Sequence, residues 1–142
     1  MSNHIDSVDD ALAQLRQAGL PANGWAYLAA EAVRWLNHAT IDPGGYSYPG
    51  DVYSVISGLQ TLMQRLPQSL NQAGGALEAL DDAGRVVDVQ RPQRTEATVV
   101  AVTESLAFAA GRADTLAREL ASAHEAAARL AYRDPAGAGE SR

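Results

Sequence analysis

Apolar residues recur at intervals of three and four along most of the chain, which is the spacing of an amphipathic α-helix. The longest run is unbroken for more than four heptads and ends at Leu130. It predicts one continuous helix from about Thr95 to Tyr132. The predicted stripe consists of Val99, Val102, Leu106, Ala109, Ala113, Leu116, Leu120, Ala123, Ala127 and Leu130.

A second long stripe precedes it, and Asp51 is expected to be its N-cap. Pro67 lies inside this stripe, and its missing backbone donor predicts a kink or a short break. Gly74 and Gly75 weaken the helix further, by roughly 1 kcal/mol each relative to alanine. The pattern therefore predicts a long, bent helix over residues 51–82. Its apolar positions are Val52, Val55, Leu59, Leu62, Leu66, Leu70, Ala73, Leu77 and Leu80.

Two shorter helices are predicted before residue 40. Ser7 and Asp10 have the spacing of a capping box at the start of the first helix, and Gly19 with Pro21 ends it. The second helix is expected from about Ala22 to Ala39.

Trp25 and Trp35 lie on the apolar stripe of the second helix, and Tyr27 lies on its opposite face. Because a stripe at helical spacing is usually buried, the two tryptophans are predicted to belong to the core.

These elements predict an all-α fold: a helical bundle of four to five helices built on a long antiparallel helical hairpin, about 51–82 and 95–132. Each apolar stripe needs a partner, so the two long helices are expected to pack on each other. Residues 1–133 are predicted to form a single helical domain, and residues 134–142 a disordered tail. Alanines outside the stripe of the last helix indicate further cover, from the first two helices or from a second copy of the chain.

Both connections around the first long helix carry candidate binding residues. Residues 83–95 contain three arginines, Arg85, Arg91 and Arg94, and one acidic residue, Asp88, so their net charge is +2. The other residues together have a net charge of −8, which gives the chain its total of −6. Arginine forks suit carboxylate and phosphate, so these three arginines are candidate anion-binding residues. The segment 86–89 has an extended, valine-rich character but is too short to indicate a strand.

The stretch "DPGGYSYPGDVYSV", residues 42–55, combines turn residues with three of the five tyrosines. The Tyr46 and Tyr48 rings either fold over Trp35 and close the core, or at least one of them stays exposed as an anchor for a partner. The Tyr53 ring is expected toward the edge of the bundle, because Val52 and Val55 define the core side of its helix. The candidate partner-binding residues are Tyr46, Tyr48, Tyr53 and Tyr27.

Composition narrows the function further. The chain has 142 residues, a net charge of −6 and no cysteine. Its 11 basic residues are all arginine and alanine is abundant, and both habits are common in GC-rich genomes. The protein is expected to be bacterial. The acidic balance argues against nucleic-acid binding. No apolar run reaches about eighteen residues, so no membrane partner is expected. The first residues lack the features of a signal peptide, and the protein is expected to be cytoplasmic.

No catalytic, metal or cofactor site is predicted. The three histidines are scattered, and the sequence contains no H-E-x-x-H, G-x-S-x-G or P-loop motif. The favoured function is therefore a non-enzymatic helical module that binds a protein partner or itself to form an oligomer. One alternative is a small-molecule-binding bundle that uses the kink near Pro67 as a pocket wall.

A second alternative is a secretion-system substrate or accessory of the helical-hairpin type. Residues 27–31, "YLAAE", look like the Y-x-x-x-D/E export signal of the small WXG-type secreted proteins of Gram-positive bacteria, which place W-x-G in the turn of a helical hairpin. The corresponding turn here, residues 83–94, has no tryptophan. The resemblance to that family is therefore not adopted, and only the alternative is kept.

Overall fold

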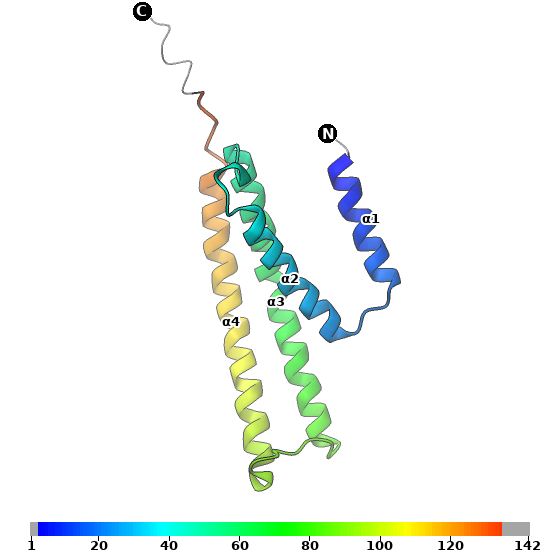
Figure 1. Cartoon of the computed structure of the whole chain (residues 1–142). Coiled ribbons are helices and arrows are strands. Elements are labelled where there is room, and N and C mark those ends of the chain that lie inside the picture. The colour runs from blue at the N-terminus through cyan, green and yellow to red at the C-terminus, as the bar shows by residue number, and fades with distance from the viewer. Residues whose placement is uncertain (1–2, 135–142) are drawn as a thin grey trace, which may run out of the picture. The chain divides into compact units, whose positions relative to one another are not determined.

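The computed structural model describes residues 3–134, which are mostly helical (Figure 1). The four α-helices are α1 (Asn3–Gln17), α2 (Ala22–Ala39), α3 (Pro49–Asp82) and α4 (Thr95–Ala127), with short 3-10 helices η1 (Pro43–Gly45) and η2 (Pro92–Arg94). The all-α fold built on a long hairpin is confirmed. The described residues contain no strand, and the valine-rich segment 86–89 is irregular.

The chain divides into two compact units between Ser47 and Tyr48, and each is described by itself. The N-terminal unit holds α1, α2 and η1; the hairpin unit holds α3, η2 and α4. The single domain over residues 1–133 stays a prediction. The tail predicted from residue 134 lies, apart from its first residue, outside the described residues.

Helix α1 begins at Asn3, so Ser7 lies inside the helix and is not its cap. The capping-box prediction is wrong because the spacing of Ser7 and Asp10 fits a helix interior as well as a helix start. The end is as predicted: Gly19 has a φ of 63°, which favours glycine, and its N–H donates to the Arg16 carbonyl at 3.3 Å.

Helix α2 has the predicted bounds, but none of its residues is buried. Trp25 is 36% exposed and Trp35 66%, and the ring of Trp35 lies 5.9 Å from that of His38 on the same helix. The prediction that both tryptophans belong to the core is therefore wrong. The physical reason within the N-terminal unit is that α1 and α2 pack only sparsely on each other, so this unit does not cover the apolar stripe of α2.

The connection after α2 turns back sharply at Gly45. A Cβ atom at this position would lie 2.5 Å from the Ala39 carbonyl oxygen and 2.8 Å from the Thr40 Cα. Those distances exclude any side chain, so glycine is required here by close backbone approach. Much of the glycine and proline content of residues 42–55 is thus accounted for by the turn.

Helix α3 begins at Pro49, so Asp51 is its third residue rather than its N-cap. The Asp51 carboxylate instead accepts a hydrogen bond from the Tyr48 backbone N–H at 2.9 Å, which is the reaching-back half of a capping box. Pro49 occupies the first turn, where its missing N–H costs nothing. The sequence prediction correctly placed Asp51 at the start of the helix, but Asp51 is the third helical residue and not the N-cap.

Helix α3 continues through Pro67, so the prediction of a short break is wrong, while the predicted kink stays a prediction. It ends in a Schellman motif, in which the Arg85 N–H donates to the Leu80 carbonyl at 2.9 Å and the Gly84 N–H to the Asp81 carbonyl at 2.8 Å. Gly84 has a φ of 67°, so the chain leaves the helix in a conformation that favours glycine. The turn into α4 therefore starts from a defined geometry.

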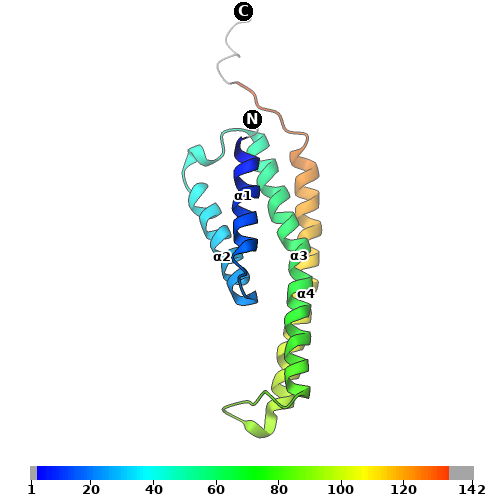
Figure 2. The same ribbon diagram turned by 90° about the vertical axis from the view of Figure 1, so that its right-hand side faces the viewer.

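Helices α3 and α4 run antiparallel along each other, as both views show (Figures 1 and 2). Gly74 is the buried residue of α3, where an added Cβ would meet Leu106 at 3.8 Å and Thr103 at 3.9 Å. The buried residues of α4 are Val99, Ala110, Ala113, Ala117 and Ala127. Small residues thus let the two backbones approach closely.

We call the residues by which α4 contacts α3 the seam of α4. In each heptad, one residue of the predicted stripe is replaced in the seam by the residue that follows it. Leu116 is 43% exposed and Val102 41%, whereas the next positions, Ala117 and Thr103, turn toward α3. Both registers carry apolar or small residues, so spacing alone could not decide between them. At 116 and 117 the smaller residue faces α3, which suits close packing. Helix α4 also ends at Ala127, before the predicted Tyr132.

Candidate interaction surfaces of the hairpin

The open end of the hairpin is closed by two aromatic contacts. Tyr53, in the first turns of α3, stacks on His124 of α4 with ring centroids 4.0 Å apart and an interplanar angle of 23°. Tyr48 meets Tyr132 edge-on at 5.3 Å. Aromatic pairs at these distances add stabilisation beyond their buried area. Tyr53 therefore has a structural contact within the hairpin, and its position toward the edge of the bundle stays a prediction.

The four tyrosines predicted to bind a partner do not all belong to one unit. Tyr48 and Tyr53 lie in the hairpin unit, and Tyr27 and Tyr46 in the N-terminal unit. Tyr27 is 69% exposed on α2, Tyr48 is 59% exposed, and Tyr46 is 37% exposed after η1. Their role in partner binding stays a prediction.

Asp88 organises the turn between the two long helices. Its carboxylate accepts hydrogen bonds from the backbone N–H groups of Gln90 and Arg91, each at 2.9 Å, and from the Thr98 hydroxyl at 2.7 Å. Its own N–H donates to the Thr95 hydroxyl at 3.0 Å. The Thr98 hydrogen bond, followed by those from the two backbone groups, holds the pKa of Asp88 below its ordinary value.

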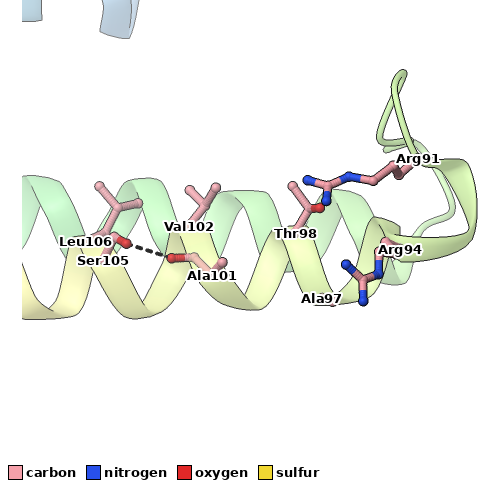
Figure 3. A pocket seen from close by; sticks show the side chains of 8 residues that line it. All are labelled: Arg91, Arg94, Ala97, Thr98, Ala101, Val102, Ser105 and Leu106. Carbon is pink, nitrogen blue, oxygen red and sulfur yellow. Dashed lines mark hydrogen bonds between the residues drawn. The ribbon is translucent and has the colours of Figure 1, made fainter.

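Arg91 and Arg94 line one surface hollow of about 560 Å³ over the first turns of α4 (Figure 3). Its floor includes the apolar Ala97, Ala101 and Val102. Two guanidinium groups above an apolar floor suit a carboxylate on an apolar segment. The structure thus brings two of the three predicted anion-binding arginines together, while Arg85 is not among the residues that line this hollow. Anion binding itself stays a prediction.

The side of α4 opposite α3 carries Phe108, the single phenylalanine of the chain, which is 72% exposed. Surface hollows lie on both sides of its ring, and the Arg112 guanidinium lies 5.8 Å from the ring centroid. Sequence reasoning missed this residue because it lies outside the apolar stripe. The signal was available: a large apolar ring at the position that faces away from a heptad stripe has no partner within a hairpin.

A small hollow of about 190 Å³ between α3 and α4 is lined by Leu70, Gly74 and Thr103 among others, and Pro67 is not among its lining residues. The small-molecule alternative stays a prediction. Within residues 3–134, no three histidine, aspartate or glutamate side chains gather closely enough to bind a metal ion. No helix in that range combines the length and the hydropathy needed to cross a membrane.

Comparison with protein-family models, with curated proteins and with solved structures found no match to this chain. Any role of the surfaces described above is therefore argued from the structure itself.

Proposed function

We propose that this protein is a non-enzymatic helical interaction module that associates with itself or with a protein partner through the outer surface of its α3–α4 hairpin. The observation that carries the proposal is the exposed Phe108, on the side of α4 that α3 does not cover. A large apolar ring between surface hollows is typical of an interface anchor.

The packing of the hairpin supports this proposal. The residues that α4 buries are small apart from Val99, and Val102 and Leu116 remain more than two-fifths exposed. A two-helix unit covers only one side of each helix, so much of its apolar surface needs a further neighbour. Interaction with another polypeptide supplies such a neighbour.

The arginine hollow provides a second element of an interface. Arg91 and Arg94 carry positive charge on a chain whose net charge is −6. This positive charge at one end of the hairpin favours contact with an acidic group of the partner. Such a contact fixes the orientation of the partner more than it adds to the binding affinity.

Sedimentation of the full chain over a wide concentration range, followed by co-purification from the native host, tests the proposal. We expect either a mass that rises above 15.0 kDa with concentration or a co-purified protein that is lost in Phe108→Ala. A protein that stays at 15.0 kDa at every concentration, with no Phe108-dependent partner, would contradict it.

A further inference from the structure

The charges along the exposed side of α4 alternate in sign, so their order is complementary to its own reverse. We define the outer face of α4 as the side turned away from α3; its residues are Ala97, Ala101, Glu104, Ser105, Phe108, Gly111, Arg112, Thr115 and Glu119. All of them are exposed. The charged residues of this face are Glu104, Arg112 and Glu119, and Arg94 of η2 precedes them just before the helix begins. From the N-terminal end, the order of charge is therefore positive, negative, positive, negative.

This order is arranged about Phe108. Glu104 lies four residues before the ring and Arg112 four residues after it, so both carboxylate and guanidinium lie within about 40° of Phe108 around the helix. Arg94 precedes the ring by fourteen residues and Glu119 follows it by eleven. The difference of three residues is about 4.5 Å along the axis, which an arginine side chain spans.

From this arrangement we infer that the outer face of α4 binds the same face of a second copy of the chain, antiparallel, with the two Phe108 rings at the two-fold axis. This inference rests on the proposed function and names its partner. In such a pair, Glu104 of each copy lies opposite Arg112 of the other. Arg94 of each copy comes within reach of Glu119 of the other, so four opposite-charge pairs form per dimer.

The antiparallel direction follows from the charges. A parallel pair in register would place Glu104 against Glu104 and Arg112 against Arg112, and like charges facing each other suppress that arrangement. A two-fold axis through the interface also closes the assembly at two copies, because the same surface is used on both sides.

Gly111 supports the same surface independently. It lies one turn from Phe108 in the interior of α4, where glycine costs roughly 1 kcal/mol relative to alanine. A Cβ atom at Gly111 would have no neighbouring atom within 4 Å, so packing inside the chain does not require glycine there. In the antiparallel pair, Gly111 leaves room beside the axis for the Phe108 ring of the second copy.

The length of the overlap is sufficient for a specific interface. With Phe108 at the axis, residues 95–121 of α4 pair with the same residues of the second copy. That range corresponds to about 40 Å of helix contact at 1.5 Å per residue. Knobs-into-holes packing of small residues over this length gives a continuous interface.

Charge reversal of the full chain tests the inference, with the dimer dissociation constant measured by sedimentation. Glu104→Arg and Arg112→Glu each turn two attractive pairs into repulsive ones, and we expect each to raise the dissociation constant at least about tenfold. The double variant Glu104→Arg/Arg112→Glu restores opposite charges across the axis and should return to within about threefold of wild type. Glu104 and Arg112 are too far apart along one helix, about 12 Å, to contact each other within a copy.

Mixing the two single variants gives a sharper readout. A Glu104→Arg copy and an Arg112→Glu copy have fully opposite charges at these positions, so heterodimers should form while each variant alone stays largely monomeric. Since the chain has no cysteine, Ala101→Cys and Thr115→Cys copies mixed under mild oxidation should form a mixed disulfide. These positions lie seven residues on either side of the axis and within about 20° of Phe108 around the helix, so they face each other in the antiparallel pair. The control Ser122→Cys, toward the end of α4, should not cross-link to itself.

The outcomes separate this inference from the proposed function. A wild-type dimer that charge reversal leaves unchanged, or efficient Ser122→Cys self-cross-linking, would overturn the antiparallel pairing while self-association stands. A monomer that binds another protein through Phe108 would also overturn it and leave the interaction module intact. A monomer with no partner would refute both.

Discussion

Helices α2 and α4 were both expected to contribute core residues, and they differ in what they bury. Helix α2 carries both tryptophans of the chain and has no buried residue, whereas α4 has five buried residues, four of them alanines. The difference is the neighbour. Helix α4 lies along α3 for most of its length, and at the 8–10 Å separation of packed helices only small side chains fit at the line of closest approach. Burial therefore follows continuous contact with a partner helix rather than side-chain size.

The largest expected effect tests the position of the seam on α4. Ala117→Asp places a carboxylate in the close contact between the helices, where it has no partner, and should destabilise the hairpin by roughly 3–5 kcal/mol. Leu116→Asp changes the neighbouring residue, which is 43% exposed, and should cost about 1 kcal/mol or less. Thermal unfolding of both variants measures the difference. Equal losses, or a larger loss for Leu116→Asp, would restore the stripe predicted from the sequence.

This pair of residues shows how far the sequence determined the fold. The bounds of α2, the all-α class and the antiparallel hairpin followed from apolar spacing and from glycine and proline positions. The choice between Leu116 and Ala117 did not, because positions one residue apart on a helix differ by only about 100° and both were apolar. Tertiary packing against α3 decided it, and that information is not local.

The candidate surfaces were predictable to different degrees. Arg91 and Arg94 were identified from a local excess of positive charge, and the turn built on Asp88 brings them to one hollow. Phe108 was not predicted because a single apolar ring outside the stripe does not contribute to the periodic apolar pattern. The contact of Tyr53 with His124 was not predicted, because the two residues are remote in sequence.

Removal of the Tyr53 ring tests the open end of the hairpin, a region of aromatic packing that α2 lacks. Tyr53→Ala loses the stacking on His124 and should lower the free energy of unfolding by about 1–3 kcal/mol. Tyr53→Phe keeps the stacked ring and serves as the control, with a change below about 1 kcal/mol. Chemical denaturation of the two variants gives the values. If both variants match wild type, the stacking contributes nothing to holding the ends of α3 and α4 together.

The two glycines of α3 separate close packing from helix propensity. Gly75→Ala adds a methyl group in open space and should stabilise the protein by up to about 1 kcal/mol. Gly74→Ala gains the same propensity, and its methyl group meets Leu106 and Thr103 at ordinary van der Waals distances, so it should not destabilise. Denaturation midpoints of the two single variants measure both effects. A loss of stability in Gly74→Ala alone would show that α3 and α4 approach more closely at this point than the structure describes.

Trp35 tests the other side of the comparison, namely that a large apolar residue of α2 is exposed. Because its side chain is 66% exposed, Trp35→Ala should change the free energy of unfolding by less than about 1 kcal/mol, far less than a core tryptophan would. Tryptophan fluorescence of Trp25→Phe, which leaves Trp35 as the single emitter, should show strong quenching by acrylamide in the folded protein. A large destabilisation together with weak quenching would place Trp35 in a core and remove the contrast with α4.

The smallest expected effect concerns the turn that delivers α4 to α3. The pKa of Asp88 in the folded chain is lowered from its ordinary value of 3.8, first by the Thr98 hydroxyl and then by two backbone N–H groups. A carboxyl group whose pKa is lower in the folded than in the unfolded state stabilises the fold above its unfolded value, and that contribution is lost as the pH falls through the folded value. The melting temperature should therefore show a small decline below about pH 4. In Asp88→Asn this component of the decline should vanish, because the amide does not titrate in this range. An identical pH profile for the two proteins would mean that the hydrogen bonds of Asp88 do not favour the ionised form, and that the turn is held by the Schellman end of α3 and by Thr95 instead.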